Sequence, residues 1–192
     1  MRTRINTYFL LLILLTGVLV RIVVYWQNRS LFLDEANLAR NFVEKSYTDF
    51  LLPLAYEQYS PPIFSWIEKA QLQWWGVHEY ALRLFPVWCS VLALVLFYQL
   101  CLRLIDNVYL RWFPLWLVAF SGWFIRYGTE VKQYSADILL GILLPYLVVR
   151  APILAPWKWA VIGVTAVWLS MPSVFFLAGI GLYFLYKYTI EQ

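Results

Sequence analysis

Long apolar runs are the feature that most restricts what this chain can fold into. A helix needs about 20 predominantly apolar residues to cross the hydrocarbon core of a bilayer. Six stretches of roughly that length follow one another along the sequence. They are residues 6–26, 80–102, 108–126, 131–150, 157–172 and 173–189. The sequence therefore predicts an all-α fold, a polytopic membrane bundle of about six transmembrane helices.

The composition agrees with a membrane protein. Of the 192 residues, 62% are hydrophobic and only 14% are charged, and the mean hydropathy is +0.66. A soluble domain with this composition would have too little polar surface. The net charge is +4, but most basic residues flank apolar runs singly and form no stripe on one face. We therefore expect membrane lipid around the chain and no nucleic-acid partner.

The cysteine and histidine residues do not predict a disulfide or a zinc site. Cys89 and Cys101 lie in one apolar run, where a helix would separate them by roughly 18 Å, too far for a disulfide. His78 is the only histidine, so the usual zinc ligands cannot be assembled. Acidic residues could hold a divalent cation, but their spacing does not require one. No metal site and no cofactor are predicted, and a divalent-metal requirement is left open.

The basic residues predict how the chain crosses the membrane. The first run follows "MRTR" and ends in Tyr25 and Trp26, an aromatic pair typical of the interface, and it is expected to remain as an anchor. With a cytoplasmic N-terminus, the inner face would carry Arg2, Arg4, Arg103, Arg111, Arg150, Lys158 and Lys187. The loop 27–79 and the segment "IRYGTEVKQY" would then both face outside. We treat residues 1–192 as a single transmembrane module.

The outer loop is predicted to contain two amphipathic helices. In the first, apolar and polar residues alternate at helical spacing over residues 36–45. The second opens with Pro61 and Pro62, which suit a helix start. It carries three tryptophans, Trp66, Trp74 and Trp75, which are more often membrane anchors than platforms for sugars. Both helices could lie on the bilayer and roof a cavity between the spans.

Two groups of charged residues fall on this outer face. Asp34 and Glu35 follow the first run, and Arg126 and Lys132 bracket Glu130 between the third and fourth runs. Charges that close to hydrocarbon are costly unless they stay hydrated or serve a function. The structural alternative is that Asp34 is the N-cap of the first amphipathic helix, with Glu35 in its first turn. Glu130 and Lys132 could likewise be ordinary interfacial charges.

Asp137 is a further candidate because of its depth. On a helix beginning near Glu130, Tyr134 and Asp137 would follow at i+4 and i+7 and share one face. Asp137 would then lie about two turns into the membrane, where a carboxylate is usually functional. The alternative is that Asp137 pairs with Arg21 and only holds the bundle together.

Several segments taken in order resemble a known family. They are "LFLDEANLAR", "YSPPIFSWIEKAQLQWWGVHEYALRLFPVWCSVLALVLFY" and "SGWFIRYGTEVKQYSADILL". The chain resembles bacterial GT-C membrane glycosyltransferases, most closely the branch of dolichyl-phosphate-mannose protein mannosyltransferases and lipid A aminoarabinose transferases. The likeness extends from the first run to about residue 180. It implies transfer of a sugar from a polyprenyl-phosphate donor to an acceptor on the outer face of a bacterial inner membrane.

The resemblance implies roles for individual residues. An acidic residue of the first outer loop is the usual catalytic group of the family, so Asp34 is the expected general base. Glu35 would bind sugar hydroxyls or tune Asp34. Arg83 matches an arginine that contacts the lipid phosphate in relatives, although a snorkelling interfacial arginine is the alternative. Glu57 and Tyr59 border the site.

The remaining charged and polar candidates suit the same chemistry. Breaking a sugar–phosphate bond leaves negative charge on the phosphate, which cations can hold without a general acid. Arg126 and Lys132 could supply those cations, and Glu130, Tyr134 and Asp137 complete the predicted substrate-binding group.

The chain also departs from the family. Where the aminoarabinose transferases place a lysine before the two prolines, this chain has Ser60. Family members are usually more than twice as long, so a C-terminal part or partner is expected to be missing. Two alternatives stay open, a non-catalytic module that binds polyprenyl-phosphate lipid or scaffolds a partner, and a transporter whose path would use Asp137 and Arg21.

Overall fold

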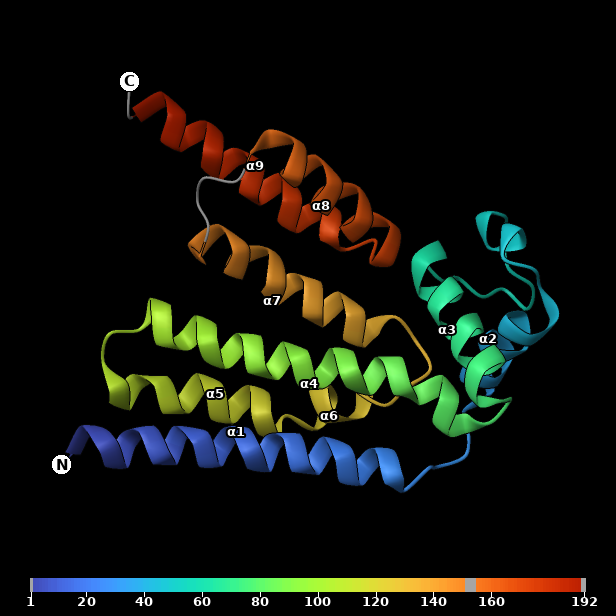
Figure 1. Ribbon diagram of the computed structural model, residues 1–192, viewed down its shortest axis with the longest axis horizontal. Coiled ribbons are helices and arrows are strands. Elements are labelled where there is room, and N and C mark those ends of the chain that lie inside the picture. Colours follow the sequence, from blue (N-terminus) through green and yellow to red (C-terminus); the bar gives the residue numbers. More distant parts are fainter. Residues whose placement is uncertain (1, 151–154, 191–192) are drawn as a thin grey trace.

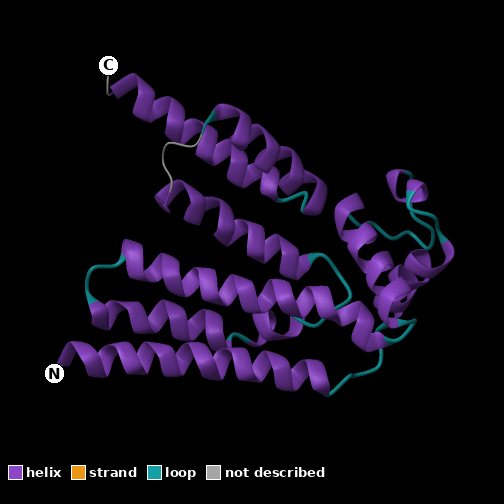
Figure 2. Cartoon of the chain, in the orientation of Figure 1, coloured by secondary structure: helices purple, strands orange, loops and turns teal. Residues whose placement is uncertain are grey.

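The computed structural model describes residues 2–150 and 155–190, and within these ranges it contains helices and no strand (Figure 2). The α-helices are α1 (Arg2–Trp26), α2 (Leu33–Glu44), α3 (Pro62–Trp75), α4 (Glu79–Leu104), α5 (Trp112–Phe120), α6 (Gly122–Tyr127), α7 (Tyr134–Arg150), α8 (Pro156–Leu169) and α9 (Ser173–Ile190). Two short 3-10 helices, η1 (Thr48–Leu51) and η2 (Val108–Arg111), lie between them. The all-α prediction is therefore confirmed.

Among the described residues, three helices are long and apolar enough to cross a membrane. They are the Thr7–Trp26 part of α1, the whole of α4 and α9. The other predicted spans form shorter helices, and the run 108–126 is divided at Ser121 into α5 and α6. The structure thus favours a membrane protein, and the number of six spans stays a prediction.

A buried arginine explains how the break at Ser121 is tolerated. The last carbonyls of a helix have no partner within the helix. Arg21 of α1 is 1% exposed and donates to the carbonyls of Val118, at 3.0 Å, and Ala119, at 2.8 Å. It also donates to Ser90 Oγ at 2.9 Å. The predicted pair between Arg21 and Asp137 is therefore wrong, because the main-chain carbonyls that α5 leaves free take the guanidinium.

The long helices α1, α4 and α7 run alongside one another (Figure 1). Helices α1, α4, α5 and α7 lie side by side, and α8 and α9 form a hairpin next to α7. Helices α2 and α3 gather at the end where α1 stops and α4 and α7 begin. The outer loop and the segment 128–133 therefore share one end of the bundle, as the sequence predicted.

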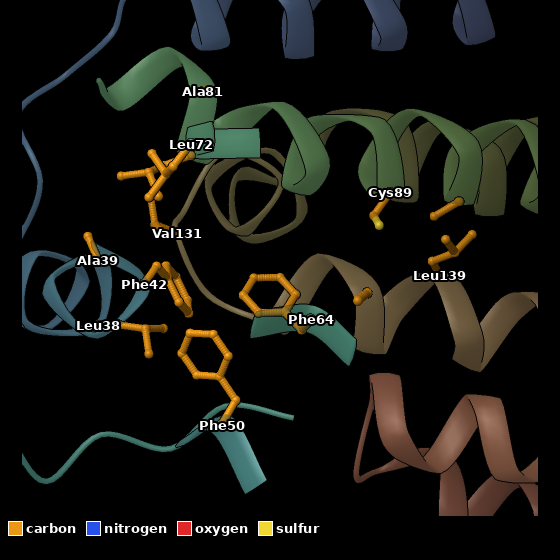
Figure 3. Packing of buried hydrophobic residues seen from close by; sticks show 13 residues of the cluster. Leu38, Ala39, Phe42, Phe50, Phe64, Leu72, Ala81, Cys89, Val131 and Leu139 are labelled. Carbon is orange, nitrogen blue, oxygen red and sulfur yellow. The ribbon is translucent and has the colours of Figure 1, made fainter. Parts of the chain in front are cut away.

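The outer loop has a core of its own that fastens it to the bundle. Phe42 of α2 packs between Phe50 and Phe64, with ring centroids 6.1 and 6.3 Å away (Figure 3). Val131 from the segment before α7 is fully buried in the same cluster. Burying such side chains stabilises by about 1.5–3 kcal/mol each, so this loop is a packed element. Helix α3 begins at Pro62 after an extended Pro61, as predicted.

The cysteines and the connection between the last two helices complete the description of the fold. Cys89 and Cys101 are free and buried in α4. Helices α8 and α9 are joined by a tight turn at residues 170–172, where the Ser173 hydroxyl donates to the carbonyl of Ser170 at 2.6 Å.

Candidate functional site

Glu35 joins the two predicted charged groups. Its carboxylate is 1% exposed and accepts hydrogen bonds from the N–H of Phe32 and the N–H of Val131, each at 2.9 Å. Arg29 donates to the same carboxylate through both terminal nitrogens, at 2.7 and 3.2 Å. The bond to Val131 spans 96 residues of sequence. Glu35 was predicted to contact substrate or tune Asp34, but this geometry favours a carboxylate that holds the site together.

The start of α2 explains the different environments of the two acids. Phe32 is the N-cap in an extended conformation, and the first helical residue is Leu33. The alternative that Asp34 caps this helix is therefore wrong. Glu35 occupies the third helical position, from which a glutamate reaches back to the N-cap N–H. Asp34, one residue earlier, remains 60% exposed.

Asp34 lies beside a hollow of about 540 Å³. The hollow is lined by Phe32, Leu33, Asp34, Asn37, Trp123, Arg126, Tyr127, Glu130 and Tyr134. The Trp123 and Tyr127 rings are stacked with centroids 5.7 Å apart, and the Tyr134 ring lies 4.9 Å from that of Tyr127. Aromatic faces next to a carboxylate and an amide suit a sugar ring, whose C–H face is apolar and whose hydroxyls need hydrogen-bond partners.

The cations of the site differ in how firmly they are paired. Arg126 donates to Glu130 at 2.8 Å, and Arg29 approaches Glu130 at 3.8 Å in addition to its bonds with Glu35. Lys132 Nζ lies 3.4 Å from Asp34 Oδ2 and donates to Gln58 Oε1 at 2.7 Å. The structure therefore brings the predicted Arg126, Glu130 and Lys132 to the same place as Asp34.

Arg83 lies on the inner side of this cluster. It is fully buried, and its Nη2 is 4.0 Å from Glu35 Oε1. Within the described part of the chain, its Nε and Nη2 atoms donate no hydrogen bond. It does not line the hollow at Asp34. The predicted contact between Arg83 and a lipid phosphate would therefore require a rearrangement around Glu35.

Asp137 and Tyr59 lie together next to this region. The prediction of a helix starting near Glu130 is wrong, because the Glu35 bond holds residues 128–133 outside a helix and α7 begins at Tyr134. Asp137 is consequently in the first turn of α7 and not two turns deep. Burial raises the pKa of the Tyr59 phenol, and the negative charge of Asp137 raises it further.

A second hollow of about 430 Å³ adjoins the same residues. It is lined by the apolar stretch 50–54 and by Gln58, Tyr59, Ser60 and Pro62. Glu57 is exposed in the preceding turn, with φ of 54°, and does not line this hollow. Of the predicted pair, only Tyr59 therefore faces a cavity.

Four residues that the sequence analysis did not select contribute to the site. Arg29 and Gln58 hold Glu35 and Lys132, and Trp123 and Tyr127 line the larger hollow. The spacing of Trp123 and Tyr127 at i and i+4 was visible, but both fell at the end of a predicted span, where aromatic residues are common. The role of Arg29 depends on the fold, and no local signal identifies it.

Within the residues that the structure describes, no group of three or more His, Cys, Asp and Glu side chains could hold a metal ion. Comparisons of this chain with protein-family models, curated proteins and solved structures gave no match. A proposal about function therefore depends on the geometry around Asp34 and on the resemblance in sequence.

Proposed function

We propose that this chain is a membrane glycosyltransferase of the GT-C type, or its catalytic module, with Asp34 as general base. It transfers a sugar from a polyprenyl-phosphate donor to an acceptor on the outer face of a bacterial inner membrane. Six spans with a cytoplasmic N-terminus put the Asp34 end of the bundle outside, and α2 and α3 lie against the bilayer surface. The observation that carries the proposal is an exposed Asp34 carboxylate on a hollow that also presents aromatic rings and cations.

In the proposed reaction the carboxylate of Asp34 accepts a proton and the cations stabilise the leaving phosphate. The acceptor hydroxyl gives its proton to the Asp34 carboxylate while its oxygen forms a bond to the anomeric carbon of the sugar. The bond from that carbon to the phosphate oxygen breaks, and the electron pair leaves with the polyprenyl phosphate. Arg126 and Lys132 stabilise the phosphate as it departs. Glu35, Arg29 and Val131 keep the acid and the cations in place.

The test is sugar transfer by the purified protein in lipid nanodiscs. Radiolabelled polyprenyl-phosphate sugars are supplied together with a lipid and protein extract as the source of acceptors. Asp34→Asn is compared with Glu44→Gln, which changes an exposed carboxylate on the same helix that pairs only with residues of the outer loop. We expect label transfer by the wild type and Glu44→Gln, and a loss of about 10²- to 10⁴-fold for Asp34→Asn.

The ion pair between Asp34 and Lys132 favours a second candidate. Lys132 lies 3.4 Å from Asp34 Oδ2 and occupies a carboxylate oxygen that an acceptor hydroxyl would have to reach. This arrangement also fits a non-catalytic module that binds polyprenyl-phosphate lipid. That candidate is preferred if the purified wild-type protein binds the lipid but transfers no sugar, and Asp34→Asn leaves cellular glycosylation unchanged.

A further inference from the structure

Among Arg29, Arg126 and Lys132, the three cations with hydrogen-bonded partners in the site, Lys132 is the one that no carboxylate holds by a hydrogen bond. Arg29 is bound to Glu35 by two hydrogen bonds and Arg126 to Glu130 by one, so each is held by a carboxylate. Lys132 instead donates to the neutral amide oxygen of Gln58, and its contact with Asp34 is longer, at 3.4 Å. An incoming phosphate anion could therefore replace these partners at a lower cost than it could replace a buried carboxylate.

Lys132 lines neither hollow itself but contacts one lining residue of each. Of its two partners, Asp34 lines the larger, aromatic hollow and Gln58 lines the smaller one beside the apolar stretch 50–54. A lipid-linked sugar has its chemical groups in a corresponding order, with a sugar, then a phosphate, then an apolar chain. Its parts match the aromatic hollow, Lys132 and the apolar hollow in turn.

This inference depends on the proposed function and specifies how the donor would bind. We infer that Lys132 binds the donor phosphate, with the first isoprene units in the 50–54 hollow, and that the phosphate draws Lys132 away from Asp34. In the unliganded protein the lysine keeps Asp34 neutralised, as an ion pair. Once the phosphate takes the lysine, the carboxylate is unpaired and can accept the proton of the acceptor hydroxyl. The base thus becomes active only when the donor is present.

The test is equilibrium binding of undecaprenyl phosphate to the full chain in nanodiscs. Lys132→Met is expected to weaken binding about tenfold or more, and Lys45→Met, which changes a lysine at the end of α2, to leave it unchanged. Gln58→Leu removes the amide that holds Lys132 but keeps the charge, so its binding should equal that of the wild type or exceed it. A loss for Gln58→Leu equal to that for Lys132→Met would show that Lys132 has only a structural role and would overturn the inference.

Asp34→Asn gives a result that a structural role of Lys132 does not predict. Removing the carboxylate frees Lys132 and removes an anion next to the phosphate, so binding should tighten by about three- to tenfold. Unchanged or weaker binding contradicts the displacement step. Inorganic phosphate should compete at least tenfold less well than the lipid, because it does not fill the 50–54 hollow. Equal competition contradicts the placement of the isoprene units.

Two outcomes separate this inference from the proposed function. If the wild type binds the lipid through Lys132 and transfers no sugar, the proposed enzyme activity fails and the binding site stands. If the wild type transfers sugar and Lys132→Met binds the lipid normally, the assignment of Lys132 fails and the enzyme activity stands.

Discussion

The carboxylate of Glu35 accepts a hydrogen bond at 2.9 Å from the main-chain N–H of Val131, which lies 96 residues further along the chain. This bond joins the outer loop to the segment before α7. Lys132, the next residue after Val131, consequently lies next to Asp34, the residue before Glu35. The two adjacent acids thus have different roles, since Glu35 holds the segments of the site together and Asp34 lines the hollow.

Replacing Glu35 should therefore weaken the fold as well as the site. In Glu35→Gln an amide NH₂ would face donors that now bind a carboxylate, and Arg29 and Arg83 would lose their shared counter-charge. We expect a loss of about 1–3 kcal/mol in the free energy of unfolding, measured by denaturant titration in detergent. Glu44→Gln serves as the control on the same helix and should change it by no more than about 0.5 kcal/mol. Equal stability of the two variants contradicts the assembling role.

The pH dependence of stability should contain a contribution from Glu68 of α3. This side chain is fully buried, and burial raises its pKa well above the ordinary value of 4.5. Because the folded state holds the proton more tightly than the unfolded state, the stabilising contribution is complete below the unfolded pKa and is lost as pH rises through the folded pKa. Glu68→Gln should remove this loss, which unfolding curves at several pH values from 4 upward will measure.

The carboxyl of Asp49 should contribute to the pH dependence of stability with the opposite sign to that of Glu68. Hydrogen bonds from the side chain and main chain of Ser46 lower the pKa of its exposed carboxyl. Its contribution is present above the unfolded pKa and is lost as pH falls through the folded pKa. Asp49→Asn should therefore lower stability above the unfolded pKa, and its stability should converge with that of the wild type as pH falls. The assignment for Glu68 is wrong if Glu68→Gln leaves the slope between stability and pH unchanged.

Arg21 should be essential for the break between α5 and α6. Arg21→Met would leave the carbonyls of Val118 and Ala119 without the donors that now satisfy them. A buried polar group left unpaired costs about 1–3 kcal/mol, so we expect at least that loss in the free energy of unfolding. Hydrogen exchange should also become faster in residues 118–127. Arg40→Met, which removes an exposed arginine of α2, is the control, and an equally small effect of both variants would contradict this role.

Gly128 should be required for the approach of the segment before α7 to α4. A Cβ atom at this position would lie 2.7 Å from Ser90 Cβ and would also clash with Ser90 Oγ. Gly128→Ala is therefore expected to destabilise the protein by about 1–3 kcal/mol and to disturb the bond from Arg21 to Ser90. Gly122→Ala is a matched control, because a Cβ there meets no atom within 4 Å.

The combination of Gly128→Ala with Ser90→Gly tests the cause of that effect. Deleting the Ser90 side chain removes both atoms that the new methyl group would strike. The double variant should therefore regain part of the stability lost in Gly128→Ala. Strictly additive losses in thermal or denaturant unfolding would show that contact with Ser90 is not the cause.

Apolar periodicity was sufficient to predict the helical fold and the loop helices. Run length located α1, α4 and α9, and the two prolines located the start of α3. The break at Ser121 was not predictable from hydropathy, because residues on both sides of it are apolar. It depends on Arg21, which is about 100 residues away in the sequence and supplies the donors for the free carbonyls.

The sequence was sufficient to predict which charged residues belong to the site, but not which of them contact each other. The charge of Asp34, Arg126, Glu130 and Lys132 next to apolar runs was enough to select them, and the structure brings them together. Their individual roles depend on differences of one residue in helix position, as between Asp34 and Glu35 at the start of α2. Local spacing predicted a helix continuing from Glu130 into α7, whereas the long-range bond from Val131 to Glu35 prevents it. Pairings such as that of Lys132 with Gln58 depend on the fold and leave no local pattern.

The most direct test of the account is the rate of sugar transfer by Asp34→Asn relative to the wild type and Glu44→Gln, with lipid binding measured on the same preparations. We predict that Asp34→Asn loses about 10²- to 10⁴-fold in transfer while it binds undecaprenyl phosphate more tightly than the wild type. Transfer by Asp34→Asn at the wild-type rate, or no transfer by the wild type from any polyprenyl-phosphate sugar, would contradict the account.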